Sequence, residues 1–329
     1  MLKKPKISVI GSGKVGENVA YYTAIKGLGD IYLFGRAKNG IHKAKGIAYD
    51  INEMVYLLGH DIKVEGVSYN EEGWEKLSDS DIVVITAGVP RRPGMSREDL
   101  LKVNLDLIKY FSQQIKKYAP NAIVIVVSNP VDVLTYMTLK FTEFPKERVM
   151  GMAGVLDTAR MKEVLYKKAE EELNKVSIKD IKALVLGTHG DTMVPVLSKT
   201  FIGNTNIRFL FGKKDIEDIV EKTKNGGGII VSYMGTSAYS APAASVVVML
   251  ESIVKDLHRI LPASVYVEGE VADWFGFEDV CVGLPVMLGR KGIEDYELVT
   301  LNARELRELQ KSAQHVKNMI KVAESLISQ

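Results

Sequence analysis

The chain has 329 residues, of which 46% are hydrophobic, and its formal net charge at pH 7 is only +2. A chain of this length and composition can bury a core in two domains of roughly 100–200 residues each. The near-neutral charge excludes a broad basic surface of the kind that binds nucleic acid or membranes. The one cysteine, Cys281, excludes a disulfide framework and a multi-cysteine metal site, so we expect no metal.

The N-terminus passes straight into a short expected strand. It lacks the apolar segment of a signal peptide, and no run of eighteen apolar residues follows anywhere in the sequence. These features predict a soluble, cytoplasmic protein that has neither a membrane nor a nucleic-acid partner.

The first half alternates short β-branched runs with segments of helical periodicity. The expected strands are residues 6–10, 30–34, 61–67, 81–88, 121–130 and 148–154, and the expected helices include residues 14–27 and 97–119. Short apolar strands separated by helices indicate parallel βαβ units. We therefore predict an α/β fold in which residues 1–153 form a doubly wound parallel sheet.

The pattern changes after about residue 154. A helix is expected at residues 156–173, strands at 181–187 and 260–267, and a long amphipathic helix at 302–327. Asn302 opens the last helix with Glu305 three residues on, which is the spacing of a capping box. Residues 154–329 are therefore predicted to form a second, α+β domain.

The first expected strand is followed by a glycine motif, G-x-G-x-x-G, at the start of a helix. Glycines at these positions permit a tight turn and let backbone N–H groups approach a pyrophosphate at the positive end of the helix. The same pattern occurs in methyltransferases and in ordinary turns, but the strand–turn–helix context favours a Rossmann dinucleotide site. The predicted cofactor contacts in this turn are Gly11, Ser12, Gly13, Lys14, Val15 and Gly16.

A dinucleotide site of this kind usually has Asp or Glu at the end of the second strand, where a carboxylate accepts the ribose 2′-hydroxyl. Gly35 stands there instead, and Asp30 begins the strand at the wrong edge of the sheet. Arg36 follows at once and Lys38 is near, so a 2′-phosphate would be paired rather than repelled. This predicts NADP, with use of NAD as well. In the alternative interpretation Gly35 only eases a turn, Arg36 points into solvent and NAD is bound.

A loop rich in glycine and proline follows the fourth expected strand and carries three cations. They are Arg91, Arg92 and Arg97, beside the carboxyl ends of the strands, where parallel sheets bind ligands. Such a loop can simply be solvated. Three cations at this edge nevertheless favour an anionic substrate.

A second cluster is divided between two segments. Asp157 and Arg160 lie three residues apart on one face of an expected helix, and His189 lies in the glycine turn of "LGTHGD" just after an expected strand. A loop histidine alone is usually a surface residue. An Asp, an Arg and a His between glycines together indicate a general base, its orienting carboxylate and a carboxylate clamp.

The chain resembles the lactate and malate dehydrogenase superfamily, specifically its lactate dehydrogenase-like malate dehydrogenases, over essentially its whole length. The resemblance is carried by "GSGKVG", "TAGVPRRPGMSREDLLKVN", "VSNPVD", "GMAGVLDTAR", "GTHGD" and "TSAYSAPA", in family order and with family-like spacing. It implies a Rossmann domain and a nicotinamide cofactor, with hydride transfer to or from a 2-hydroxy or 2-oxo acid. It also implies a place in the tricarboxylic acid cycle.

The resemblance implies roles for individual side chains. His189 would donate and accept the hydroxyl proton, and Asp157 would orient it. Arg160 would clamp the substrate C1 carboxylate, and Arg97 would polarise the reacting carbonyl when its loop closes. Asn129 would hydrogen-bond the substrate and help to position the nicotinamide.

The remaining predicted site residues also come from the resemblance. Ser237 would lie on the substrate wall, and the Asn129–Pro130 peptide would be cis. Further cofactor contacts would come from the carboxyl ends of the fourth and fifth expected strands and from the helix between them: Thr86, Ala87, Gly88, Asn104, Val127, Ser128 and Asn129.

Arg91 lies six residues before Arg97, where the resemblance places the side chain that faces the distal group of the substrate. Lactate enzymes carry Gln there. A guanidinium in a closed pocket pairs with a second carboxylate but faces only a methyl group when pyruvate binds, so oxaloacetate is the expected substrate. Met95 agrees with malate usage, and the adjacent Arg92 is the competing candidate. A lactate or other 2-hydroxy-acid dehydrogenase is the alternative.

Two rival readings come from other classes of protein. A non-catalytic nucleotide-binding relative would be expected to lack part of the set His189, Asp157, Arg97 and Arg160, all of which are present. A nucleotide-dependent glycosidase would need metal-ligating Cys and His residues in its second half, where Cys281 is the one cysteine.

The family implies a homo-oligomer, a tetramer or a dimer. The apolar patterning of residues 46–59, and of a helix expected across residues 229–250, leaves surface to be covered, although an internal core is the alternative. Pro242 is expected to kink that second helix, because it has no N–H and clashes with the preceding turn.

Overall fold

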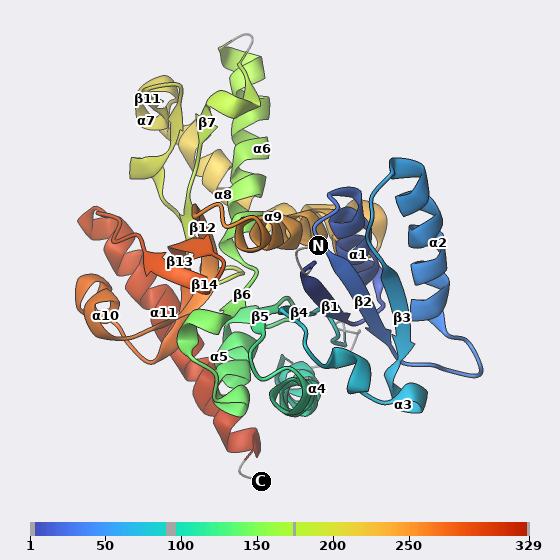
Figure 1. Cartoon of the computed structure of the whole chain (residues 1–329). Coiled ribbons are helices and arrows are strands. Elements are labelled where there is room, and N and C mark those ends of the chain that lie inside the picture. The colour runs from blue at the N-terminus through green and yellow to red at the C-terminus, as the bar shows by residue number, and fades with distance from the viewer. Residues whose placement is uncertain (1–3, 90–96, 174–175, 328–329) are drawn as a thin grey trace.

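The computed structural model describes residues 4–89, 97–173 and 176–327 (Figure 1). Its main feature is one nine-stranded sheet with the order β14-β13-β12-β6-β5-β4-β1-β2-β3. Two short sheets, β11-β10-β7 and β8-β9, belong to the second half of the chain. Within the described residues, no helix is both long and apolar enough to cross a membrane.

Six strands of the large sheet are parallel and come from the first half of the chain. They are β1 (Lys6–Ile10), β2 (Asp30–Gly35), β3 (Val64–Ser68), β4 (Ile82–Ile85), β5 (Ile123–Val126) and β6 (Val149–Gly151). The central strands read IVVI and IVIV and are wholly buried, as expected for a parallel sheet that is covered on both faces. The order β3-β2-β1-β4-β5-β6 is that of a doubly wound nucleotide-binding sheet, so the predicted Rossmann fold is confirmed.

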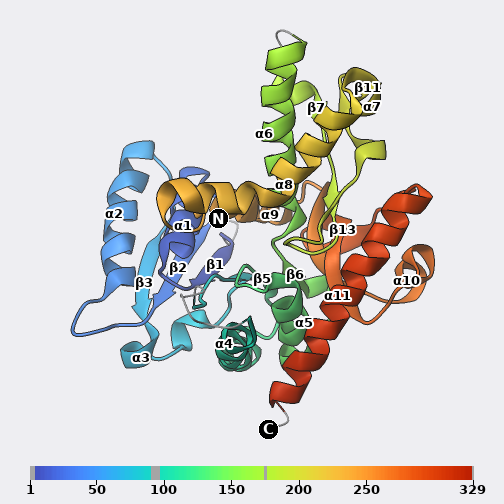
Figure 2. The ribbon, with the colours of Figure 1, turned by 180° about the vertical axis from the view of Figure 1, so that it is seen from behind.

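Helices cover this parallel part of the sheet (Figures 1 and 2). They are α1 (Lys14–Ile25), α2 (Lys43–Leu58), the single turn α3 (Tyr69–Glu72), α4 (Arg97–Tyr118) and α5 (Val131–Thr142). α2 lies at the outer edge of the molecule in both views. Its inward face buries residues at helical spacing, namely Ala44, Ala48, Ile51 and Val55. Its outward face instead exposes large apolar side chains, among them Tyr56 and Leu57.

The second half of the chain extends the same sheet with three antiparallel strands, β12 (Arg259–Val267), β13 (Val280–Gly289) and β14 (Gly292–Tyr296). β12 joins β6 where Ser264 pairs with Gly151. The other elements of this half are α6 (Gly154–Glu172), β7 (Ile181–Lys182), β8 (Val185–Leu186), β9 (Val194–Pro195), β10 (Phe201–Ile202), β11 (Thr205–Asn206), α7 (Ile207–Leu210), α8 (Lys213–Met234), α9 (Ser240–Val254), α10 (Gly269–Phe275) and α11 (Ala303–Ile327).

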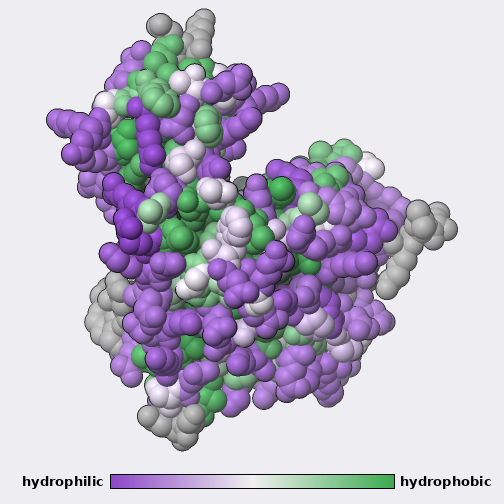
Figure 3. Space-filling model, turned by 90° about the vertical axis from the view of Figure 1, so that its left-hand side faces the viewer, coloured by the Kyte–Doolittle hydropathy of each residue, from purple (hydrophilic) through white to green (hydrophobic). Residues whose placement is uncertain are grey.

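The lobe formed by α6, β7, β11 and α7 stands above the rest of the molecule in Figure 1. A side view shows a mostly hydrophilic surface, with hydrophobic residues gathered where this lobe meets the body (Figure 3). One hydrophobic core runs through both halves of the chain, from Ile7 on β1 to Ala323 on α11. Cys281 on β13 is buried in this core.

The single helix expected across residues 229–250 is wrong. α8 ends at Met234, Gly235 follows with φ of 65°, and α9 begins at Ser240. Pro242 is the third residue of α9 and kinks nothing, because a proline in the first turn removes an N–H that has no partner within the helix. The strand expected at residues 181–187 is likewise split, into β7 and β8.

The capping box predicted at the start of α11 is present. The Glu305 N–H donates to Asn302 Oδ1 at 3.0 Å, and the Asn302 N–H donates to Glu305 Oε2 at 3.2 Å. Glu305 is buried and also accepts the Ser198 N–H and hydroxyl, at 2.9 and 2.6 Å. The cap therefore ties α11 to the segment after β9, in addition to closing the helix.

Candidate active site

The glycine turn between β1 and α1 is shaped by its backbone. Gly11 has φ of 119°, and a Cβ on Gly16 would lie 1.8 Å from the Gly11 oxygen, so only glycine lets α1 pack this closely on the turn. Gly13 is the N-cap of α1 and has open space where a side chain would project. No side chain from the described part of the chain caps the helix. The N–H groups of its first turn therefore fit a pyrophosphate.

The segments after β4 and β5 are fixed beside this turn. The Thr86 hydroxyl lies 3.2 Å from the Ile10 carbonyl oxygen and 3.1 Å from that of Gly11, and the Ser128 hydroxyl donates to the Ala87 carbonyl at 2.7 Å. The other residues predicted to contact the cofactor lie in the same three segments: Ser12, Lys14, Val15, Gly88 and Val127.

Asn104 on α4 joins two of these segments. Its Oδ1 accepts the Val89 N–H at 2.7 Å, and its Nδ2 donates to the Asn129 carbonyl at 2.8 Å. The side chain is buried. Asn104 thus holds the walls of the predicted cofactor site together through internal hydrogen bonds. The Asn129–Pro130 peptide is cis, as the family resemblance implied.

Gly35 ends β2, where an acidic residue was expected. A Cβ there would lie 2.4 Å from Ser12 Oγ and 3.0 Å from Ala44 Cβ, so the absence of a side chain has a packing cause. The sequence did not reveal this contact. Arg36 is exposed, and its guanidinium forms no hydrogen bond or ion pair with another described residue. Lys38 is also exposed and pairs through its backbone with Ile41.

Asp157, Arg160 and His189 are brought together as predicted. Asp157 Oδ2 lies 2.9 Å from His189 Nδ1, and Asp157 Oδ1 accepts Arg160 Nη1 at 3.0 Å. Asp157 is buried in the first turn of α6 and therefore links the imidazole to the guanidinium. This arrangement fixes the ring of His189 and leaves its Nε2 to exchange a proton.

The loop that carries His189 is held against β13 and α11. The backbones of Gly187 and Gly283 exchange two hydrogen bonds of 2.9 Å, and a Cβ on Gly283 would lie 2.5 Å from the Gly187 oxygen. The Thr188 N–H donates to Ser312 Oγ on α11 at 2.9 Å. Gly187 itself has φ of 82°, and a Cβ on it would lie 2.7 Å from Ser312 Oγ, so glycine is favoured at this position before the histidine.

The pKa of His189 is raised above its ordinary value of 6.5. Burial alone would lower it, because a buried imidazolium loses hydration. The charge of Asp157 and its hydrogen bond outweigh this effect, although Arg160 opposes them. The cluster therefore favours the protonated imidazole.

Arg160 passes close to a run of glycines in α8. A Cβ on Gly226 would lie 3.2 Å from Arg160 Cδ, and one on Gly227 would lie 3.6 Å from its Nη2. The Arg160 Nε is buried and has no hydrogen-bond partner among the described residues. The guanidinium thus retains donor capacity for an anion. Sequence analysis missed this glycine run. Glycine lowers the stability of a helix, and nothing in the neighbouring sequence explains why it stands there.

The cavity beside His189 has a volume of about 500 Å³ and is also lined by Asn129, Asp132 and His315. Ser237 is exposed in the segment between α8 and α9 and makes no hydrogen bond to the described part of the catalytic cluster. Arg91, Arg92 and Met95 lie outside the described residues. Arg97 is the first residue of α4, but its side chain also lies outside the description.

Sequence analysis also missed Asp132. This side chain is 5% exposed and accepts the backbone N–H of His189 at 3.0 Å and the hydroxyl of Ser264 at 2.7 Å. The acid stands in "VSNPVD" and falls in the first turn of α5, where an acidic side chain is an ordinary preference at a helix N-terminus.

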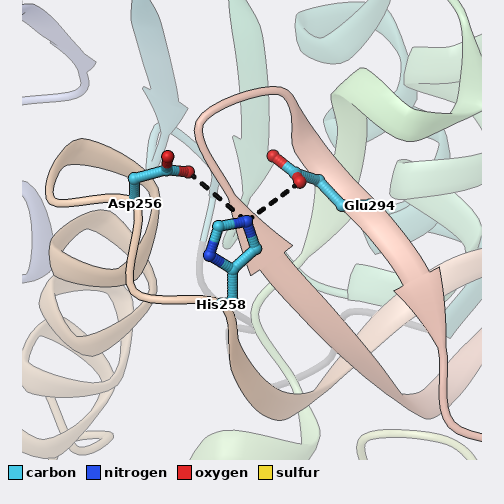
Figure 4. A group of neighbouring side chains, drawn as sticks. All are labelled: Asp256, His258 and Glu294. Carbon is cyan, nitrogen blue, oxygen red and sulfur yellow. Dashed lines mark hydrogen bonds and ion pairs between the residues drawn. The ribbon is translucent and has the colours of Figure 1, made fainter.

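Three titratable side chains, Asp256, His258 and Glu294, form a separate cluster where the α9–β12 connection meets β14 (Figure 4). His258 Nε2 lies 3.2 Å from Glu294 Oε2 and 3.7 Å from Asp256 Oδ1. Among the described residues this is the one group whose geometry would suit a metal ion. Its side chains are partly exposed, and an ion pair of this kind contributes at most about 1 kcal/mol. We assign it no part in the reaction.

Both halves of the chain match the models of known protein families. Residues 5–151 match the family model for the lactate/malate dehydrogenase NAD-binding domain, and residues 154–327 match that for the α/β C-terminal domain. Malate dehydrogenase 2 of Aquifex aeolicus (strain VF5) is 57% identical over 100% of this chain and 97% of its own.

Two solved structures are similar along nearly their entire length. The malate dehydrogenase from Picrophilus torridus in its apo form has a TM-score of 0.92 and 36% identity, with 98% of each chain covered. The lactate dehydrogenase from Eimeria maxima with NADH and oxamate has a TM-score of 0.90 and 35% identity, with 100% of this chain and 96% of the other covered. The chain belongs to the lactate/malate dehydrogenase family.

Proposed function

We propose that the chain is a malate dehydrogenase, which reversibly transfers a hydride between NAD(P)H and oxaloacetate to give (S)-malate. The observation that carries the proposal is the hydrogen-bonded series Arg160–Asp157–His189, in a chain that also has an open dinucleotide turn. Relatives named malate dehydrogenase at 57% and 48% identity support the choice of substrate.

When bound, the nicotinamide cofactor supplies the hydride. His189 gives a proton to the carbonyl oxygen during reduction and takes it from the hydroxyl during oxidation. Asp157 keeps Nδ1 protonated and stabilises the imidazolium. The donors of Arg160 that Asp157 does not use pair with the C1 carboxylate. Such positioned acid–base help is worth roughly 10²–10⁴-fold in rate.

The test follows nicotinamide absorbance with oxaloacetate, pyruvate and sugar phosphates as separate substrates. We expect rapid turnover of oxaloacetate, weak turnover of pyruvate and none of the sugar phosphates. Preference for pyruvate would favour a lactate dehydrogenase. Binding of the cofactor without turnover of any of these compounds would favour a non-catalytic relative.

Arg91 is proposed to select oxaloacetate, since a guanidinium pairs with the second carboxylate of a dicarboxylate. We expect Arg91→Gln to lower the ratio of kcat/KM for oxaloacetate to that for pyruvate by about a hundredfold. Arg92→Gln is the matched control and should leave the ratio nearly unchanged. Equal effects of the two changes would show that the wrong arginine has been chosen.

NADP is proposed as the preferred cofactor, with NAD also used. The support is the exposed Arg36 next to Gly35, which offers a planar charged group to a 2′-phosphate. Arg36→Ala should raise KM for NADPH about tenfold, or roughly 1.4 kcal/mol, and leave KM for NADH unchanged. Parallel changes in KM for both cofactors would mean that Arg36 does not bind the 2′-phosphate.

A homo-oligomer is proposed, most simply a dimer or a tetramer. The outward face of α2 leaves Tyr56 77% and Leu57 89% exposed, and Tyr233 near the end of α8 is 87% exposed. Large apolar side chains gathered on a surface indicate a protein interface. Light scattering should therefore give a multiple of the 36.4 kDa chain mass. Leu57→Asp should shift the mass toward that of the monomer.

A further inference from the structure

Asp132 is a buried carboxylate that the proposed reaction does not use. It lies in the first turn of α5, directly after the cis peptide, and both of its oxygens are engaged. Oδ2 accepts the N–H of His189 at 3.0 Å, and Oδ1 accepts the hydroxyl of Ser264 on β12 at 2.7 Å. Asp132 therefore connects the backbone of His189 to the central sheet.

The negative charge at this position costs stability. Burial raises the pKa of Asp132, and the hydrogen bonds from Ser264 and His189 offset this only in part. An acid whose pKa is higher in the folded chain than in the unfolded chain loses folded-state stability as pH rises through the folded value. An asparagine has the same shape, can accept the same N–H and can donate to the Ser264 oxygen. Stability alone therefore does not account for a carboxylate here.

The charged groups around His189 come from three elements. Among the described residues, Asp157 and Arg160 face it from α6, and Asp132 faces it from α5. His315 on α11 and Asp191 in the loop of His189 itself line the same cavity. Around Asp132 itself stand His189, Asp157 and Cys281 on β13, and burial raises the pKa of the Cys281 thiol. Both carboxylates favour the imidazolium form of His189, whereas Arg160 opposes it.

We propose that Asp132 is a positioning residue for the reaction: its carboxylate fixes the backbone at His189, so that the imidazole stays on Asp157, and its charge stabilises the imidazolium. The inference rests on the proposed acid–base role of His189. Asp157 acts on the ring through Nδ1, whereas Asp132 acts through the main-chain N–H of the same residue.

The test is Asp132→Asn, which removes the charge and keeps the shape. In oxaloacetate reduction, which needs protonated His189, kcat/KM should fall about tenfold at about pH 9 and stay near wild type at about pH 5.5. In malate oxidation, which needs neutral His189, activity should persist to lower pH than in the wild type. The melting temperature should stay equal or rise, because a buried charge is lost.

Thr135→Val is the matched control. Thr135 is buried on the same helix, and its hydroxyl donates to the Val131 carbonyl, away from His189. This variant is expected to keep the wild-type pH profile whatever its melting temperature. Asp132→Ser provides a second neutral variant should Asp132→Asn fail to fold, and it should shift the profile in the same direction.

A readout independent of turnover separates this inference from the proposed function. Histidine ring NMR titration of the whole protein, assigned with His189→Asn, gives the His189 pKa directly. A lower His189 pKa in Asp132→Asn supports the inference even if oxaloacetate proves not to be the substrate. An unchanged His189 pKa in the neutral variants would overturn it, as would parallel losses of melting temperature and kcat at every pH.

Discussion

The glycine turn proposed to bind the cofactor and the cluster proposed to catalyse the reaction are built by opposite means. In the turn, three glycines within six residues shape the backbone, and the N–H groups of the first helical turn remain available for a pyrophosphate. In the cluster, side chains provide the chemistry and come from distant segments. His189 meets partners that are 57 and 32 residues away in the chain. The first region is a local structure, whereas the second exists only in the folded chain.

This difference means that the two regions should fail in different ways. A change in the turn alters close packing or the space in front of the helix, so it should affect stability or cofactor binding. A change in the cluster alters charge and proton transfer, so it should affect turnover. The comparison would be contradicted by a change in the turn that lowers turnover alone, or by a change in the cluster that lowers cofactor binding alone.

The largest effect is expected from His189→Asn. It removes the acid–base group but leaves the turn intact, so kcat should fall by about a thousandfold or more while binding of NADH or NADPH persists. Stopped-flow turnover and fluorescence titration of the nucleotide would measure the two properties separately. A variant with near-normal kcat would refute the assignment of His189.

The next largest effect is expected in the glycine turn, where Gly16 and Gly13 should respond differently to substitution. Gly16→Ala places a Cβ 1.8 Å from the Gly11 oxygen, so α1 must move, and we expect a loss of about 3 kcal/mol or more in unfolding free energy. Gly13→Ala enters open space, so it should keep the melting temperature but raise KM for the cofactor about tenfold. An unchanged KM for the cofactor in Gly13→Ala would show that the open space at Gly13 is not a binding feature.

Gly35→Asp should move the cofactor preference toward NADH by about tenfold, since a carboxylate accepts the ribose hydroxyl and repels a 2′-phosphate. The new side chain collides with Ser12, so the single variant should also lose stability. Adding Ser12→Gly should restore the melting temperature without reversing the preference. An unchanged preference in the stable double variant would mean that Gly35 serves packing alone.

The smallest effect tests the glycine run of α8. Gly226→Ala brings a Cβ to 3.2 Å from Arg160 Cδ and should shift the guanidinium, raising KM for oxaloacetate a few-fold, by roughly 0.5–1 kcal/mol. Gly228→Ala has nothing within 4 Å and should gain helix stability without changing KM. A similar KM for oxaloacetate in both variants would show that the glycine run does not influence substrate binding.

Much of the fold and of the cluster was predictable from sequence. The six parallel strands are short apolar runs with strong β propensity, so their existence did not depend on distant contacts. The Asp157–His189 pair was found because each residue lies in a distinctive segment. One hydrogen bond of 2.9 Å joins the two side chains.

What sequence analysis missed depends on distant neighbours. Nothing in the sequence around Asp132 marks it as a partner of His189, and its other partner, Ser264, lies 132 residues further on. Gly35 looked like a vacancy for a carboxylate until Ser12 was found against it. The break between α8 and α9 at Gly235 was hidden because both flanking segments are apolar. In each case tertiary packing, rather than local propensity, decides the outcome.

The pairing of Ser264 with Gly151 has a consequence for how the whole chain loses its structure. This contact makes one continuous sheet from two family domains, and a single core extends across it. We therefore expect the halves to unfold as one cooperative unit. Heating should give a single calorimetric transition, and a protease cut between residues 151 and 154 should not release two separately folded fragments.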